Sequence, residues 1–395
     1  MKLIPRLDLL QQLHSLRGTP DIKVITGVRR SGKSELMRSF LSSIEKEPDA
    51  NIVYIDLTDL GNEPLKEYHA LHKYVQERLK PDLVNVLCID EVQLCDNFEL
   101  AINSIHSKGQ WDIYLTGSNA FMLSSDLATL FTGRYVEVHV YPFSFKEFRQ
   151  YFDEGDVNAQ FDEYVTTGGM AGSYLYDTNQ GRSSYVRAVY NTIVNRDIVQ
   201  ERSITNVAGF NALAEFLMDN IGNLTSANSI SGALTGGGKP SSHVTVGSHI
   251  GYLCESFLFY KVKRYDIRGK RYLETEDKYY LADQGFRWAV LGTRNMDYGH
   301  VYENIVAIEL MRRGYDVYVG KLYKKEIDFV AMRASEKLYI QVSDDISSPG
   351  TLERETDPLL RIRDAYPKIL LANTKHDEYD VEGIRVVDMA RWLAG

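Results

Sequence analysis

The sequence predicts an α/β protein whose first part is a doubly wound parallel sheet. Short aliphatic runs such as IKVITG and VNVLCIDE alternate with helical patterns, and strands without polar alternation require helices on both faces of a parallel sheet. A glycine-rich turn follows the first of these strands and a pair of carboxylates follows the third. Both features lie at the edge where such sheets bind ligands. At 395 residues the chain exceeds the size of a single hydrophobic core, so we expect further domains.

The expected elements and domains follow in order along the chain. The first domain has expected strands at 22–27, 51–57, 84–91 and 112–118 and helices from 33, around 65–79 and around 98–106. A helical, aromatic-rich segment comes next. Three helices followed by a two-strand pattern then have the order of a winged helix, and the tail reads as a small α/β domain. The expected domains are a core at 1–145, a helical subdomain at 146–204, a winged helix at 205–290 and a C-terminal α/β domain at 291–395.

Composition limits the class of protein. The chain is 44% hydrophobic and 25% charged and has three cysteines, which is typical of a globular protein in a reducing compartment. No apolar run approaches the roughly 20 residues that cross a bilayer, so we expect a cytoplasmic protein without membrane contact. The formal net charge of −9 argues against a protein that coats nucleic acid over its whole surface, but it allows a local basic face.

The turn after the first strand matches a phosphate-binding loop. Gly27, Gly32, Lys33 and Ser34 fit G-x-x-x-x-G-K-[ST], between a buried strand and a helix. Backbone N–H groups of such a loop surround a phosphate at the positive end of the helix. The lysine reaches the β and γ phosphates, and the serine hydroxyl binds Mg²⁺. The expected ligands are ATP and Mg²⁺, and the expected cofactor-binding residues are Gly27, Arg29, Arg30, Ser31, Gly32, Lys33, Ser34 and Glu35.

Hydrolysis needs a second element, which the run VLCIDEV supplies. Asp90 and Glu91 follow its aliphatic residues. We expect Asp90 to hold Mg²⁺ and Glu91 to orient and deprotonate the attacking water, although two such carboxylates can also cap a helix. The next strand ends near Ser118 and Asn119, which either contact the γ-phosphate or form a plain turn. No N-K-x-D guanine motif is present, which favours ATP over GTP.

Four runs, GVRRSGKS, CIDEVQ, LTGSNAFMLSSDLATLFTGRY and YPFSFKEF, closely resemble the prokaryotic AAA+-type ATPases that join an AAA domain to a C-terminal domain of uncharacterised function. The resemblance covers nearly the whole chain. It implies ATP hydrolysis, a sensor position at Ser118 with Asn119, and an arginine finger at Arg134. Arg196 or Arg202 would serve equally if the helical subdomain folds over the nucleotide. A finger acting in trans would require a homo-oligomer.

The expected winged helix suggests a DNA or protein partner. Its two-strand pattern carries cations and tyrosines in alternation, and a wing of this composition can lie along a phosphate backbone. The preceding helix has few long donors for base edges, so sequence-specific reading is not expected. Packing within the chain or against a protein explains the same pattern equally well. The candidate DNA contacts are Lys261, Lys263, Arg264, Arg268, Lys270 and Arg271.

The tail resembles the PD-(D/E)xK nucleases in the order of its elements, with Glu303 on a helix, Asp328 on a hairpin and Gln341 on the next strand. Those enzymes require a carboxylate and, two residues later, a lysine on that strand to bind Mg²⁺ and activate water. Here Gln341 and Ser343 hold these positions. Lys325 or Lys368 would have to replace the missing ammonium, so a degenerate domain kept for binding or regulation is the expected state.

Two functions therefore remain open from the sequence. The first is an ATP-driven switch or motor that acts on DNA or a protein through the winged helix and the tail. The alternative is an ATP-regulated DNA nuclease that cuts with its C-terminal domain.

Overall fold

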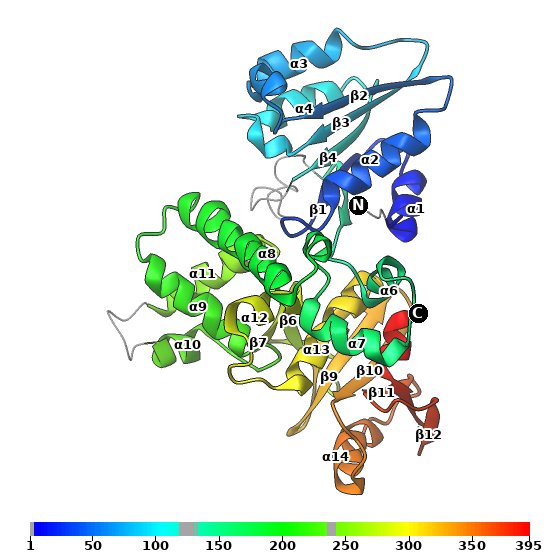
Figure 1. The fold of residues 1–395 in the computed structure, drawn as a ribbon, viewed down its shortest axis with the longest axis vertical. Helices are drawn as coiled ribbons and strands as arrows, with labels where there is room; N and C mark the ends of the chain where they lie inside the picture. The colour runs from blue at the N-terminus through cyan, green and yellow to red at the C-terminus, as the bar shows by residue number, and fades with distance from the viewer. Residues whose placement is uncertain (1–3, 118–130, 132, 235–241) are drawn as a thin grey trace. The chain divides into compact units, whose positions relative to one another are not determined.

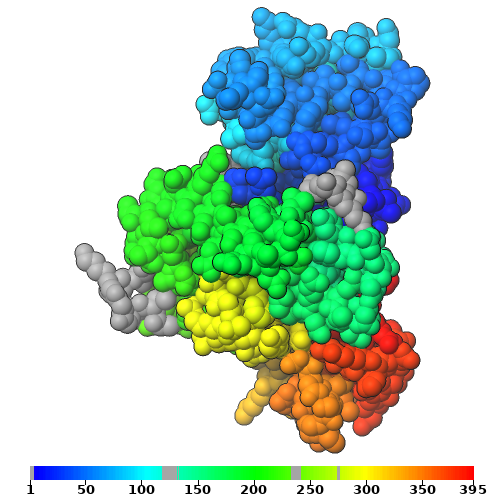
Figure 2. Space-filling view, viewed as in Figure 1, coloured from blue at the N-terminus to red at the C-terminus, as the bar shows by residue number. Residues whose placement is uncertain are grey.

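The computed structural model of the chain describes residues 4–117, 131, 133–234 and 242–395. It contains two compact units, and the chain passes from one to the other between Val140 and Tyr141. Figure 1 labels the helices and strands of both units, and Figure 2 shows their surfaces in the same colours. Within the described ranges, no helix has both the length and the apolar character that crossing a bilayer requires.

The amino-terminal unit contains the predicted parallel sheet. Its strands lie in the order β2-β3-β4-β1-β5, and each neighbouring pair runs parallel. The strands are β1 (Ile22–Thr26), β2 (Ala50–Asp56), β3 (Val84–Asp90), β4 (Asp112–Thr116) and β5 (Tyr135–His139). The helices are α1 (Leu7–Ser15), α2 (Lys33–Ile44), α3 (Tyr68–Gln76) and α4 (Phe98–His106), with short 3₁₀ segments at Leu60–Lys66 and Val92–Leu94. The predicted doubly wound α/β fold is confirmed.

Helices cover both faces of this sheet, as its aliphatic strands require. Helices α1 and α2 pack on one face, where Leu13 and Phe40 join a buried cluster with Val86. On the other face α3 and α4 bury Leu71 and Ile102. Figure 1 shows the two helix pairs on either side of the strands. This arrangement leaves the carboxyl ends of β1, β3 and β4 at one edge of the sheet, together with the residues that follow them.

The carboxyl-terminal unit combines helices with a mixed eight-stranded sheet of order β12-β13-β11-β10-β9-β8-β6-β7. Its first helices are α6 (Phe145–Tyr151), α7 (Val157–Thr167), α8 (Asn179–Thr192), a π-helix (Ile193–Gln200), α9 (Val207–Asp219), α10 (Ala227–Leu234) and α11 (His243–Glu255), with a 3₁₀ segment at Ala171–Leu175. Then come β6 (Phe259–Asp266), β7 (Arg271–Leu281), α12 (Gln284–Leu291), α13 (Tyr298–Arg312), β8 (Asp316–Leu322), β9 (Lys325–Arg333) and β10 (Glu336–Ser343). The last elements are α14 (Pro349–Leu360), β11 (Lys368–Ala372), β12 (Tyr379–Val381), β13 (Ile384–Asp388) and α15 (Met389–Ala394).

The hairpin β6–β7 differs from its expected place. Helices α9, α10 and α11 precede it in the order of a winged helix, but β6 also pairs in parallel with β8, where Tyr265 is opposite Gly320. The hairpin therefore extends the sheet of the tail. One sheet runs across the expected boundary at residue 290, because β8 offers β6 a free row of backbone hydrogen-bonding groups that a sheet edge must satisfy. The fourfold division of the chain stays a prediction.

Candidate functional site

The turn between β1 and α2 has the conformation that phosphate binding requires. Gly27 and Gly32 have φ values of 136° and 100°, in the left-handed region that favours glycine. A Cβ atom on Gly27 would overlap the carbonyl oxygen of Val140 and would lie 3.2 Å from Ser31 Oγ. Helix α2 begins at Lys33 with Gly32 as its N-cap, without a side-chain cap. Its first N–H groups can therefore bind an anion.

The polar groups of this loop point inward. Lys33 is 4% exposed, and its Nζ donates to the carbonyl oxygens of Gly27 and Val28 at 2.9 and 3.2 Å. Ser31 Oγ is buried and has no hydrogen-bond partner among the described residues. Because a buried hydroxyl normally has a partner, this orphaned atom and the glycine cradle beside it fit a ligand with acceptor oxygens, such as a phosphate. Arg6 braces the loop by donating to the Ser31 carbonyl oxygen at 3.2 Å.

Asp90 lies at the end of β3, beside the first turn of α2. Ser34 Oγ donates to its Oδ1 at 3.1 Å, and the Tyr54 hydroxyl donates to its Oδ2 at 3.3 Å. Thr116 also donates to Asp90, and Asp90 is 2% exposed. Burial raises the pKa of Tyr54 to about 12, and the negative charge of Asp90 contributes, so Tyr54 remains a donor at neutral pH. The sequence analysis missed Tyr54, which lies within β2, and Thr116, which ends β4, because these strands become neighbours of β3 only in the sheet.

Glu91 follows in a left-handed turn with φ of 55°. Its backbone N–H donates to Thr116 Oγ1 at 2.9 Å, and Gln93 donates to its carboxylate. Thr116 thus connects the two acidic residues by accepting from one and donating to the other. A left-handed conformation is unusual for a residue other than glycine, and such strain is concentrated at functional sites. Glu91 is the N-cap of the 3₁₀ segment that follows β3.

These residues fit a bound Mg²⁺ ion. The Ser34 hydroxyl and the Asp90 carboxylate are oxygen ligands that lie side by side, and Mg²⁺ in proteins takes one or two such ligands together with phosphate oxygens and water. Ser34 and Asp90 would hold the ion. When bound there, Mg²⁺ neutralises charge on the phosphates. Elsewhere in the described part of the chain, no three His, Cys, Asp or Glu side chains converge on a metal position.

The remaining predicted loop residues lie at its outer side. Arg29 is half-buried, whereas Arg30 is exposed and has a φ of 66°. Glu35, in the first turn of α2, pairs with Arg38 at 2.6 Å. This ion pair ties Glu35 to the surface of the helix.

Of the predicted sensor and finger residues, the structure describes Arg134 but not Ser118 and Asn119. Ser118 and Asn119 lie outside the described residues. Arg134 is exposed and directly precedes β5, where Ile22 of β1 is opposite Tyr135. Arg134 therefore lies at the amino edge of the sheet, about 16 Å along the strands from the edge that carries the phosphate-binding loop. It cannot reach the loop of its own chain.

The alternative finger residues lie in the carboxyl-terminal unit. Arg196 is exposed on the π-helix. Arg202 pairs with Glu255 at 2.7 Å and lies over the ring of Tyr252, 4.8 Å from its centroid, so it has structural contacts within its own unit.

A further polar group that the sequence analysis missed lies at the ends of β1 and β5. Thr26 Oγ1 donates to Glu137 at 2.5 Å and lies 2.9 Å from His139 Nδ1. Burial acts to raise the pKa of Glu137, but hydrogen bonds from His139 and Thr26 hold it below its ordinary value. The alternation of Glu137 and His139 along β5 places both on one face of the strand, beside the residue that precedes the loop.

The predicted DNA contacts divide into two groups. Lys261 pairs with Asp277 at 2.7 Å and Arg264 with Glu276 at 3.2 Å, so these two cations are neutralised within the hairpin. Arg271 lies 3.8 Å from Asp266. The other three, Lys263, Arg268 and Lys270, are exposed and make no ion pair with another described residue.

The predicted nuclease-like residues Glu303, Asp328 and Gln341 lie close together. A lysine that the sequence analysis did not identify lies among them. Lys278 of β7 lies 2.8 Å from Glu303 and 2.7 Å from Glu326, and it is 3% exposed. Burial, and next the charge of Glu303, raise the pKa of Asp328 well above its ordinary value, against the ammonium of Lys278. Lys278 thus places a positive charge among these carboxylates. It was missed because Lys278 of β7 meets Glu303 of α13 and Glu326 of β9 only in the folded unit.

The two lysines predicted as replacements for the missing ammonium, Lys325 and Lys368, have other contacts. Lys325 pairs with Asp357, and Lys368 Nζ donates to the carbonyl oxygen of Ile362 at 2.6 Å. Gln341 accepts from the backbone N–H of Asp328 at 3.4 Å and donates to Glu355 at 3.2 Å. The amide of Gln341 thus binds protein groups on both sides, and neither Lys325 nor Lys368 supplies the missing ammonium.

The fold and the loop define the class of the amino-terminal unit, a P-loop α/β fold. Residues 19–149 match the family model described as an AAA domain, and residues 158–297 match a domain of unknown function (DUF8612). The chain belongs to the family of an uncharacterized protein of Haemophilus influenzae, to which it is 37% identical over 398 residues, 99% of this chain and 98% of the relative. An uncharacterized protein of Methanocaldococcus jannaschii is 25% identical over 351 residues, 85% of this chain and 77% of the relative.

Solved structures with a similar chain course include the Aeropyrum pernix ORC1 protein in complex with DNA, at a TM-score of 0.32 and 12% identity, over 79% of this chain and 95% of that one. AMPPCP-bound DnaA from Aquifex aeolicus has a TM-score of 0.31 and 12% identity, over 63% of this chain and 86% of that one. Similarity at this level carries no inference about ligand or partner.

Proposed function

We propose that the protein binds ATP with Mg²⁺ at the loop between β1 and α2 and hydrolyses it, as a switch or motor that acts on a DNA or protein partner. The observation that carries this proposal is the contact of Ser34 with Asp90 at 3.1 Å, next to the ammonium of Lys33. A magnesium-binding pair and a phosphate-binding cation adjoin in one site, which is the arrangement of ATP-hydrolysing P-loop proteins.

The chain's own residues take defined roles in this reaction. The ammonium of Lys33 attracts the β and γ phosphates, and the N–H groups at the start of α2 donate to phosphate oxygens. Ser34 and Asp90 hold the metal. Glu91, on its separate turn, orients a water and accepts its proton as the water attacks the γ-phosphate. The buried Thr116 holds the carboxylate of Asp90 and the backbone of Glu91, and Gln93 donates to the Glu91 carboxylate.

Turnover and binding together test this proposal. ATP binding is measured by titration calorimetry with Mg²⁺, and phosphate release by a coupled assay. Lys33→Ala should abolish binding, whereas Glu91→Gln should bind ATP and lose about 10²- to 10⁴-fold in turnover, the contribution of a general base. Lys46→Ala changes an exposed lysine of the same unit and should match the wild type. Absence of binding heat for the folded wild type would refute the proposal, as would normal turnover of Lys33→Ala.

The position of Arg134 adds a proposal about assembly. Because Arg134 lies at the opposite sheet edge from its own loop, it can stabilise a γ-phosphate only in another subunit, as an arginine finger worth about 10³ to 10⁵ in rate. Turnover per chain should then rise with protein concentration, and Arg134→Ala should abolish that rise. A turnover number that is constant over a dilution series would refute a finger in trans.

The nuclease alternative has less support. The ammonium of Lys278 lies between Glu303 and Glu326, where it partly neutralises the carboxylates that a metal would need. Purified protein with Mg²⁺ or Mn²⁺ should therefore not nick plasmid DNA, and cleavage that Asp328→Ala removes would restore the alternative.

A further inference from the structure

A group of tyrosines gathers on one face of the eight-stranded sheet, at the end formed by β6, β7 and β8. Tyr265 is opposite Tyr272 in the hairpin, so both side chains point to the same face, and Tyr318 of β8 joins them. The ring centroid of Tyr265 lies 5.6 Å from that of Tyr272 and 6.1 Å from that of Tyr318, and the latter two are 5.1 Å apart. These three residues are called the tyrosine face below.

This face is open at one side. Farther along the sheet, Tyr265 belongs to a buried cluster with Leu359 of α14, so α14 covers that part of the same sheet surface. Strand β7 ends the sheet, and there Tyr272 is 57% exposed. Tyr366 is 45% exposed as well. Tyr265 is only 8% exposed and Tyr318 is partly buried, so Tyr272 and Tyr366 are the rings of this region that a ligand can contact.

Two lysines, Lys337 and Lys270, lie near the tyrosine face, together with the carboxylate of Asp364. Lys337 Nζ lies 5.2 Å from the ring centroid of Tyr265 and 5.3 Å from that of Tyr366. Burial lowers the pKa of Lys337, and the positive charge of Lys270 lowers it further, although Asp364 opposes both effects. Within the described ranges, Lys270 and Lys337 make no ion pair. Two neighbouring cations without an ion-pair partner favour an anionic ligand.

We infer that the tyrosine face binds a single-stranded nucleic acid, with a base stacked on Tyr272 and phosphates beside Lys270 and Lys337. Every base offers an aromatic face to a ring, and a cationic surface follows the backbone. The bases of a duplex are stacked on one another and are read in the grooves by helices or ribbons, which this open sheet face does not supply. The inference rests on the proposed function, in which DNA is one of the partners, and it names the form of that partner.

An apolar protein surface would also cover the exposed rings. It would, however, leave Lys270 and Lys337 desolvated without an anion, which is unfavourable. The charges therefore favour a ligand that brings phosphates together with aromatic faces.

The test uses the full-length protein and a fluorescein-labelled oligodeoxythymidine of 20 nucleotides, with binding followed by fluorescence anisotropy. The competitor is an unlabelled 20-base-pair duplex. The variants are Tyr272→Ala, Tyr272→Phe, which keeps the ring, and Lys337→Gln. Tyr379→Ala is the matched control, because Tyr379 is a 42% exposed tyrosine on β12, at the other end of the same sheet.

Tyr272→Ala should weaken binding at least about fivefold, the lower limit for loss of one stacked base. Tyr272→Phe and Tyr379→Ala should bind like the wild type, and Lys337→Gln should weaken binding and its dependence on salt. If Tyr272→Ala is unstable by circular dichroism, Tyr366→Ala takes its place. Equal binding by Tyr272→Ala and Tyr379→Ala, preference for the duplex, or no binding by the wild type would overturn the inference.

ATP turnover of the same samples separates this inference from the proposed function. If the wild type turns over ATP but does not bind the oligonucleotide, the tyrosine face is refuted while the ATPase proposal stands. If the wild type binds the oligonucleotide without turning over ATP, the ATPase proposal fails and the binding surface stands.

Discussion

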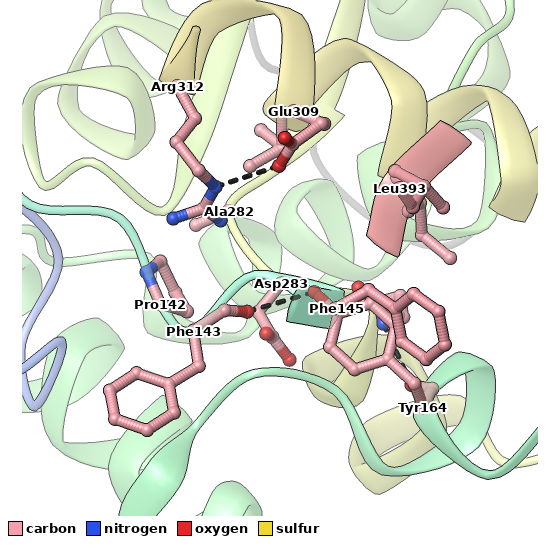
Figure 3. A pocket seen from close by; sticks show the side chains of 12 residues that line it. Pro142, Phe143, Phe145, Tyr164, Ala282, Asp283, Glu309, Arg312 and Leu393 are labelled. Atoms are coloured by element: carbon pink, nitrogen blue, oxygen red, sulfur yellow. Dashed lines mark hydrogen bonds and ion pairs between the residues drawn. The ribbon is translucent and has the colours of Figure 1, made fainter. Parts of the chain in front are cut away.

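Asp283 allows a direct measurement of how burial sets the charge of a carboxyl group in this protein. It caps α12, and its two oxygens accept from the backbone N–H groups of Gly169 at 2.5 Å and Gly285 at 2.8 Å. The side chain lines a cavity of about 10 Å³ (Figure 3), which has room for no more than about one water. Burial raises the pKa of Asp283 from 3.8 to about 7, although both N–H groups and Arg312 lower it.

The sign of the effect on stability follows from this direction. A carboxyl group with a higher pKa in the folded state binds its proton more tightly there, so the folded state is favoured at low pH. This advantage is lost as the pH rises from 3.8 through about 7. With these two pKa values, the contribution of Asp283 to the free energy of unfolding falls by about 2.5 kcal/mol between pH 5 and pH 8.

Urea unfolding of the wild type and of Asp283→Asn at several pH values between 5 and 8, followed by tryptophan fluorescence, measures this difference. Asparagine cannot ionise, so the stability of the wild type should fall relative to the variant as the pH rises. Other titrating groups are common to both proteins and cancel. Asp156→Asn is the matched control, because Asp156 caps α7 in the same way but is exposed; its profile should parallel the wild type. Parallel profiles for the wild type and Asp283→Asn would refute the reasoning.

Two further changes test other parts of the structure. Lys278→Met leaves the buried Glu303 without its cation and should lower the free energy of unfolding by about 3 to 5 kcal/mol in urea titrations. Adding Glu303→Gln to this variant should recover most of the lost stability. A single variant as stable as the wild type would contradict this reasoning. Gly27→Ala forces a Cβ against the Val140 carbonyl at a φ of 136° and should weaken ATP binding in calorimetry by about 1 to 3 kcal/mol. Gly61→Ala, where a Cβ has ordinary contacts, should bind ATP like the wild type. Equal ATP affinities for both variants would refute the requirement for glycine at position 27.

Much of the candidate ATP site was predictable because its residues are close in sequence. Gly27 to Ser34 lie in a single turn. The run that ends in Asp90 and Glu91 is recognisable because an aliphatic strand precedes these two residues. The role of Thr116 could not be predicted in this way, because a threonine at the end of a strand has no local sequence signal that distinguishes it from others. Its importance appears only when β4 is placed beside β3, where its hydroxyl bridges the two acidic residues.

The sequence by itself determined the parallel α/β fold, the phosphate-binding loop and the pair of acidic residues, because local hydrophobic pattern and short motifs act over a few residues. Only the tertiary structure decided that Lys278 stands among the nuclease-like carboxylates and that Arg134 lies at the edge away from its own loop. It also decided that the hairpin Phe259–Leu281 belongs to the sheet of the tail. The physical reason is the same in each case: pairing between strands and the burial of charge depend on contacts between residues far apart in the chain, and no local pattern encodes which strands become neighbours.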